Sequence, residues 1–165
     1  MVLILLNFST SFSQEKSKKE IRKEHKIEQQ KKTEALVNSK NFMFVANRAI
    51  PQGYPTVDLN SNPNHLKFSP ELIESYMPFF GRTYQVNFNR EGGFKFKAKP
   101  ESYDLLITQK GYDLKVKVKD NNDSYDIFLN ISPEGTASLT IASNNRSTIS
   151  YNGNIEPVPA EKELE

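Results

Sequence analysis

The sequence contains no cysteine and no tryptophan, and it has only two histidines among its 165 residues. The absence of cysteine excludes disulfide bonds, thiolate metal sites, a cysteine nucleophile and the lipidated cysteine of a bacterial lipoprotein. No apolar run is long enough to cross a bilayer, because a spanning helix needs about 20 apolar residues. Carboxylates, hydroxyls, basic side chains and aromatic rings are left to carry a function.

The two histidines lie in contexts that do not indicate catalysis. His25 is in a charged segment, where we expect it to be solvated, and His65 follows a Pro-Asn turn at the expected start of a strand. The Gly-x-Ser-x-Gly motif of serine hydrolases is absent from the sequence. We therefore expect a protein that is not an enzyme and needs no cofactor. The alternative is a small hydrolase with paired carboxylates drawn from Glu71, Glu74 and Asp104.

Calcium is the one metal for which the sequence offers a candidate cluster, Asp120-Asn121-Asn122-Asp123 together with Asp126. The cluster lacks the loop length and the terminal glutamate of an EF-hand. Asp and Asn are also the usual residues of tight turns. We therefore expect a hairpin turn here and no metal site.

The positive charge of the chain is concentrated near its N-terminus. Residues 14–40 hold nine Lys or Arg and five Glu, a net charge of +4, whereas the rest of the chain is −2 and the total is +2. A basic segment on a nearly neutral body is poor evidence for a nucleic-acid-binding domain. We therefore expect no nucleic acid as a partner.

The first residues are typical of a secretory signal. An apolar run over 2–6 is followed by Ser11 and Ser13 before an abrupt change to charged residues, so we expect cleavage between Ser13 and Gln14. A basic region before the apolar run is missing, which leaves open a start upstream of Met1, a degenerate signal or a buried N-terminal strand. We expect an exported protein, periplasmic or extracellular.

Four segments follow from the composition. Residues 1–13 are the expected signal peptide, residues 14–40 a charged helical linker, residues 41–157 a β domain and residues 158–165 a flexible tail. The linker is rich in Glu, Lys and Gln but carries no continuous apolar stripe, so we expect a solvated helix that docks only through Ala35 to Val37.

The β domain is indicated by strict alternation of apolar and polar residues. The clearest runs lie over 94–98, 112–118, 125–131, 137–141 and 149–151, with less regular runs over 42–46, 56–59 and 65–68. The turn signals between them are Asp120 to Asp123, Pro133-Glu134-Gly135, Ser143-Asn144-Asn145 and Asn152-Gly153. Such short intervals indicate hairpins, so the predicted fold is mostly β, an antiparallel meander forming a curled sheet or a barrel.

A short helix is expected over Pro70 to Tyr76. Ser69 is a favourable cap, Pro70 suits the first helical position and Glu71 suits the positive end of a helix. Pro78 would end the helix, and the helix would lead into the stretch Met77-Pro78-Phe79-Phe80-Gly81-Arg82.

That stretch, the Gly92-Gly93-Phe94 turn and the closing run Asn145 to Gly153 carry a resemblance to a known family. Over about 42–155 the chain resembles a family of uncharacterised exported domains from Bacteroidetes-type bacteria with a Leu-Pro-Tyr-Phe-Gly-Arg-like motif. Met77 and Phe79 replace the commoner Leu and Tyr. The resemblance implies a bacterial envelope location, and because the family has no known function it implies no catalytic residues.

Aromatic residues around the same stretch form the candidate ligand site. Rings can bind an apolar or sugar ligand, and a guanidinium can hold an anion. The alternative is that the rings fill the core and the arginines bond strand carbonyls or Asp side chains. The candidate residues are Tyr76, Phe79, Phe80, Arg82, Tyr84, Arg146 and Tyr151.

Two lysine rows, Lys95-Lys97-Lys99 and Lys115-Lys117-Lys119, would attract anionic lipid or glycan if they shared a face. The alternative is that they are interleaved with acids and protect edge strands from aggregation. The sequence predicts a non-catalytic ligand-binding or interaction module, and the resemblance implies that it belongs to the bacterial envelope. The alternatives are the carboxylate hydrolase and a structural partner in an envelope assembly.

Overall fold

The computed structural model describes residues 17–84, 92–120 and 123–159. The predicted signal peptide, most of the predicted tail and the centre of the candidate calcium cluster lie outside these ranges. The elements are α1 Lys18–Ser39, β1 Phe42–Pro51, β2 Val57–Asp58, β3 His65–Phe68, β4 Ile73–Met77, β5 Phe94–Ala98, β6 Pro100–Thr108, β7 Gly111–Asp120, β8 Asp123–Ile131, β9 Thr136–Ser143 and β10 Ile149–Pro157.

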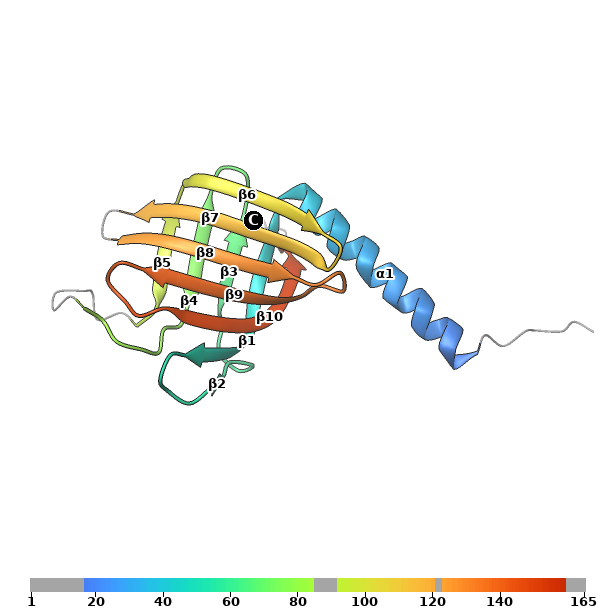
Figure 1. The fold of residues 1–165 in the computed structure, drawn as a ribbon, viewed down its shortest axis with the longest axis horizontal. Coiled ribbons are helices and arrows are strands. Elements are labelled where there is room, and N and C mark those ends of the chain that lie inside the picture. Colours follow the sequence, from blue (N-terminus) through green and yellow to red (C-terminus); the bar gives the residue numbers. More distant parts are fainter. Residues whose placement is uncertain (1–16, 85–91, 121–122, 160–165) are drawn as a thin grey trace, which may run out of the picture.

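The strands form one antiparallel sheet in the order β5-β4-β3-β1-β10-β9-β8-β7-β6, with β2 added beside β1. Figure 1 shows β6 to β10 as one layer that crosses over a second layer made of β1, β3, β4 and β5. The paired strands β1 and β10 join the two layers, so the sheet curls into a nearly closed barrel. The predicted curled antiparallel meander is confirmed.

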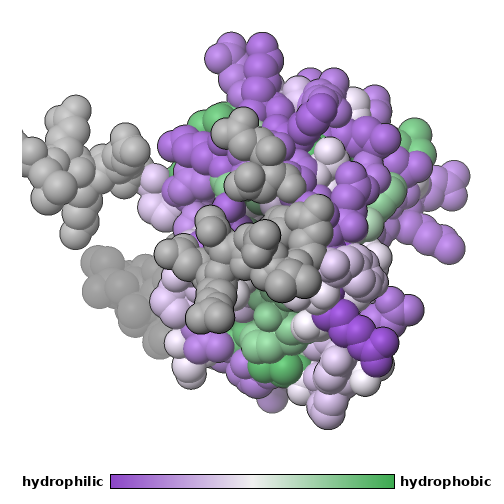
Figure 2. Space-filling view, turned by 90° about the vertical axis from the view of Figure 1, so that its left-hand side faces the viewer, coloured by the Kyte–Doolittle hydropathy of each residue, from purple (hydrophilic) through white to green (hydrophobic). Residues whose placement is uncertain are grey.

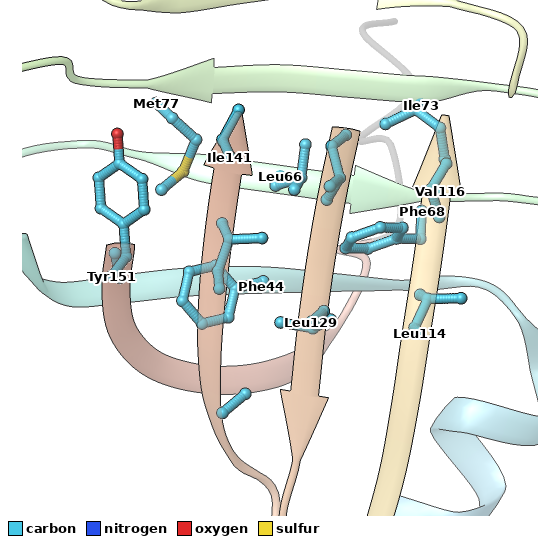
Figure 3. Close-up of a cluster of buried hydrophobic side chains, with 14 of the residues drawn as sticks. Phe44, Leu66, Phe68, Ile73, Met77, Leu114, Val116, Leu129, Ile141 and Tyr151 are labelled. Atoms are coloured by element: carbon cyan, nitrogen blue, oxygen red, sulfur yellow. The ribbon is translucent and has the colours of Figure 1, made fainter. Parts of the chain in front are cut away.

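The core lies between the two layers because alternate side chains of each strand point inward. Figure 3 shows Phe44, Leu66 and Met77 from the rear layer facing Leu129 and Ile141 from the front layer. All five side chains are no more than 1% exposed. A continuous apolar interior of this kind is the main source of stability for a small β domain.

The predicted polar helix is confirmed as α1, but it contacts the barrel over its second half, from Lys26, which lies 2.9 Å from Glu134, to Val37. Ser17 and Glu20 form a reciprocal capping box at its start. Thr33 and Val37 are the buried residues of the helix, whereas Ala35, which was expected to dock, is exposed. Figure 1 shows the first turns extending away from the sheet. Among the described residues, no helix is long and apolar enough to cross a membrane.

The predicted helix over Pro70 to Tyr76 is wrong. Ser69 opens a hairpin turn instead, since its backbone N–H and its hydroxyl both donate to the Leu72 carbonyl at 3.0 and 2.9 Å. Strand β4 follows at Ile73 and pairs with both β3 and β5. Serine and proline favour a turn start as well as a helix start, and burial of alternate residues decided between them.

The predicted turn at Asn152-Gly153 is also wrong, because both residues lie inside β10. Gly153 faces Ala46 at a bulge in β1, where a Cβ on Gly153 would lie 2.0 Å from the Val45 carbonyl oxygen. The glycine is there for close approach of two backbones rather than for a turn. Strand β6 was not predicted, because the run Leu105-Leu106-Ile107 hides its alternation.

Candidate functional site

The Met77 to Arg82 stretch packs onto the end of the barrel at which β4 finishes. Met77 is buried, and Phe79 and Phe80 are half-buried against the core. The Tyr151 hydroxyl, deep in the core, donates to the Pro78 carbonyl oxygen at 2.6 Å. Burial raises the pKa of Tyr151, more than the nearby Arg146 lowers it, so the hydroxyl keeps its proton. The stretch is therefore tied to the core from beneath.

Arg146 is buried and closes the same end of the barrel. Its guanidinium carbon lies 5.2 Å from the ring centroids of both Phe79 and Phe94, and one terminal nitrogen donates to the Gly93 carbonyl. Burial lowers the pKa of Arg146, but an arginine stays charged at neutral pH. The charge is therefore stabilised by two ring faces and a carbonyl within the end of the barrel.

Arg82 and Tyr84 are exposed, but their backbones are fixed. The Arg82 carbonyl accepts from the Ser147 N–H at 2.9 Å, and the Tyr84 N–H donates to the Asn145 carbonyl at 2.8 Å. The stretch after Gly81 thus runs beside the β9–β10 loop as a short antiparallel bridge. Figure 2 views this end of the barrel, whose surface is largely hydrophilic with a hydrophobic area beside the grey residues.

Tyr76 is separated from this cluster because it points outward from β4. Its ring stacks on His65 at 5.9 Å, and the Lys95 amino group lies 5.1 Å from its centroid. A hollow of about 240 Å³ lies beside Tyr76 and Lys95. The structure therefore brings together Phe79, Arg146 and Tyr151 inside the barrel end, and it leaves Tyr76, Arg82 and Tyr84 at the surface.

A larger cavity, of about 870 Å³, lies over the β6 to β9 part of the sheet, away from the predicted site residues. None of the seven predicted residues lines it. Its lining is Lys40, Tyr103, Asp104, Leu105, Leu106, Asp113, Leu114, Lys115, Phe128, Leu129, Asn130, Ser138 and Thr140. We call this cavity the β6–β9 basin.

Strand register places eight of the residues that line the basin in two parallel rows on the outer face of the sheet. One row runs Leu106, Asp113, Asn130, Ser138, and the other runs Asp104, Lys115, Phe128, Thr140. The Asn130 amide donates to the Asp113 carboxylate, which fixes both side chains. Phe128 is 44% exposed in the middle of the second row. The basin thus offers an aromatic face surrounded by hydrogen-bonding groups.

Tyr103 lies at the β6 side of the basin. Burial raises its pKa to about 12, and its hydroxyl is buried without a hydrogen-bond partner among the described residues. The Lys40 amino group lies 5.6 Å from its ring centroid. A buried hydroxyl without a partner is costly. Because Tyr103 pairs with the core residue Val116 and alternates with Asp104, its side chain lies on the inner face of β6, away from the two outer rows.

Lys95 and Lys97 of the first row lie on β5, Lys99 follows the end of β5, and the second row lies on β7, which does not pair with β5. Acids are interleaved with them: Lys97 lies 3.7 Å from Glu74, and Lys117 lies 3.5 Å from Asp126. This arrangement agrees with the expectation that the lysines alternate with acids. Contact with an anionic lipid or glycan stays a prediction.

The described residues contain no group of three or more His, Cys, Asp or Glu side chains placed to hold a metal ion. Asp123, from the candidate calcium cluster, accepts instead from the Ser143 hydroxyl and from the Ser124 and Asn144 N–H groups. Within the part of the chain that the structure describes, this carboxylate fixes the start of β8 against the β9–β10 loop.

Sequence reasoning missed the basin although one signal was present. Tyr125, Ile127, Leu129 and Ile131 are in phase and point inward, so Phe128 stands out of phase on the wet face of β8. Phe128 and the exposed Leu106 both line the basin, and an exposed apolar area on an otherwise polar sheet face is a candidate binding surface.

Comparison with known proteins gives a family and a fold. The family model described as "Domain of unknown function (DUF4251)" matches residues 24–155. A crystal structure of a DUF4251 family protein from Bacteroides eggerthii matches with a TM-score of 0.61 at 18% identity, over 78% of this chain and 87% of that one. At this identity the likeness concerns the fold alone. The search of curated proteins found no match.

Proposed function

The chain belongs to the DUF4251 family of domains of unknown function, and from that premise we propose that it is a non-catalytic module of the bacterial envelope that binds an uncharged glycan in the β6–β9 basin. The observation that carries the proposal is the exposed Phe128 ring on a polar sheet face. The apolar face of a sugar ring packs on an aromatic ring, and its hydroxyls need donors and acceptors at the rim.

The polar groups of the basin suit hydroxyls better than a net charge. Asp104 and Lys115 face each other across β6 and β7, so their charges offset one another. Asp113 and Asn130 form a fixed pair that offers both acceptors and a donor. Ser138 and Thr140 add hydroxyls on β9. A neutral ligand with many hydroxyls would meet partners on three sides of Phe128.

The test is titration calorimetry of the purified chain with a panel of neutral oligosaccharides built from hexose and N-acetylhexosamine units. The Phe128→Ala variant should bind the best ligand at least about tenfold more weakly, because stacking and apolar contact are lost. The matched control is Tyr84→Ala, which removes an exposed ring outside the basin and should bind normally. No binding by any oligosaccharide, or equal binding by Phe128→Ala, would contradict the proposal.

One observation favours a second candidate, a glycoside hydrolase. Asp104 and Asp113 are diagonal neighbours on the outer face of β6 and β7, and both line the basin. Glycosidases use a pair of carboxyl groups that flank the scissile bond. If the protein hydrolyses the bound oligosaccharide, new reducing ends appear. Their formation by the unmodified chain and its loss in Asp104→Asn would favour an enzyme over a binding module. Stable binding without release would support the module.

The location is a separate part of the proposal. The apolar run and small residues before Gln14 support export. Mass spectrometry of the protein recovered from the periplasm or medium of its host should find Gln14 as the first residue. A protein retained in the cytoplasm with residues 1–13 intact would contradict export.

A further inference from the structure

The two edge strands of the sheet, β5 and β6, are protected very differently. Strand β5 alternates apolar residues with Lys95 and Lys97, and charged side chains of this kind keep an edge from pairing with another chain. Strand β6 begins with Pro100, but no charged residue lies between Asp104 and Lys110. The second half of β6 is therefore an edge without the usual protection.

The same half of β6 carries exposed aliphatic side chains. Leu106 is 62% and Ile107 is 65% exposed, the highest values for large aliphatic residues in the described part of the chain. Because neighbouring residues of a strand point to opposite faces, one apolar side chain lies on each side of the edge. Among the described residues, only β7 pairs with β6, so one row of its backbone groups faces outward.

We propose that the β6 edge pairs antiparallel with the β6 edge of a second copy of this chain, giving a two-fold dimer with a sheet that continues across the interface. A second copy is favoured because β6 is complementary to itself. Its first half holds Glu101 and Asp104, its middle is apolar, and a lysine flanks each end, Lys99 before Pro100 and Lys110 after Thr108. Antiparallel pairing brings Lys110 of each copy beside the acidic half of the other, whereas Lys99 lies beyond the end of the other copy's β6.

A two-fold axis at Leu106 gives the most favourable register. Leu106 then faces Leu106 of the second copy on the outer face of the sheet, and Leu105 faces Ile107 on the inner face. Asp104 faces Thr108, with Lys110 on the adjacent diagonal, so no two like charges oppose each other. Since Leu106 also lines the β6–β9 basin, the basins of the two copies would lie side by side. The inference does not depend on what the basin binds.

The absence of cysteine allows a direct test with single-cysteine variants of the full chain. Directly opposed residues in a non-hydrogen-bonded antiparallel pair have Cα atoms about 4.5 Å apart, within the range of about 4.4–6.8 Å that a disulfide accepts. Leu106→Cys should therefore give a disulfide-linked dimer under mild oxidation. Ser102→Cys lies on the same face of β6, but its two copies would be separated by about 27 Å, so it should stay unlinked.

Sedimentation of the unmodified chain supplies the second arm. The chain should be a dimer that dissociates on dilution, and Leu106→Lys should weaken association at least about tenfold. The control Tyr84→Lys, at an exposed position far from β6 in the sequence, should leave association unchanged. Circular dichroism confirms that each variant is folded. A monomer at every concentration, a dimer unaffected by Leu106→Lys, or equal crosslinking at positions 102 and 106 would overturn the proposal.

Discussion

Tyr151 illustrates how one residue can satisfy a ligand-site pattern and yet be used internally. It lies near Arg146 and the Met77 to Arg82 stretch, as an aromatic residue of a pocket would, but the structure buries it completely. Its hydroxyl donates to the Pro78 carbonyl. From sequence alone, a tyrosine that binds a ligand and a tyrosine that fixes a loop look the same, because both need a ring and a hydroxyl.

Replacement of Tyr151 by Phe should destabilise the protein by about 1–2 kcal/mol, since the Pro78 carbonyl loses its partner while the ring packing stays the same. Urea unfolding followed by circular dichroism measures the difference. The matched control is Tyr54→Phe, at a residue that is 50% exposed, which should change stability by less than about 0.5 kcal/mol. Equal stability of Tyr151→Phe and the unmodified chain would show that the bond to Pro78 contributes nothing.

At the scale of elements, β4 is bound to its neighbours by polar contacts on the outer face. The Glu74 carboxylate lies 3.6 Å from Lys67 on β3 and 3.7 Å from Lys97 on β5. Partial burial raises the pKa of Glu74, but Lys67, Lys97 and His65 outweigh that effect, and the pKa lies below its ordinary value. The carboxylate is thus ionised at neutral pH and is a poor choice for the proton donor of a hydrolase.

The lowered pKa of Glu74 predicts a pH dependence of stability. The native state binds the proton less readily than the unfolded chain does, so the contribution is complete above the unfolded pKa and is lost as pH falls through the folded pKa. Because the pair is partly exposed, the effect is at most about 1 kcal/mol. The stability difference between the unmodified chain and Glu74→Gln should be largest near neutrality and should shrink in acid and in high salt. A difference independent of pH would contradict this assignment.

The pairing of β1 with β10 gives the second prediction at this scale. Ala in place of Gly153 would bring a methyl group against the Val45 carbonyl, so the two central strands must separate. Gly153→Ala should cost about 2 kcal/mol or more in thermal or urea unfolding. The control Gly92→Ala should cost far less, since a Cβ at Gly92 meets no described atom within 4 Å. Similar losses for both variants would mean that the close approach at Gly153 is not the cause.

A strand could be predicted from the sequence where its apolar and polar residues alternate clearly. The run over 112–118 alternates strictly, the run over 125–131 alternates except at Phe128, and both are strands in the structure. Ser69-Pro70-Glu71 misled the prediction because the same residues start a turn or a helix, and only pairing with β3 and β5 selects the strand. Strand β6 was missed because an edge strand with exposed Leu106 and Ile107 does not alternate in polarity.

At the scale of the whole molecule, the curled antiparallel sheet followed from hairpin spacing, whereas the site did not. Register decides which side chains share a face, and no local pattern connects Leu106, Asp113, Asn130 and Ser138 across four strands. The predicted aromatic cluster lies at one end of the barrel, and the basin lies over the outer face of β6 to β9. Only the folded sheet shows that these are different surfaces.

An amide chemical-shift titration distinguishes ligand binding in the β6–β9 basin from binding at the Met77 to Arg82 end of the barrel. The isotope-labelled chain is titrated with the tightest oligosaccharide, and the shifts are mapped on the fold. We expect the shifts to concentrate on strands β6 to β9 around Phe128, with little change near Arg82 and Arg146. Shifts concentrated at the Met77 to Arg82 end, with the basin unchanged, would contradict binding in the basin.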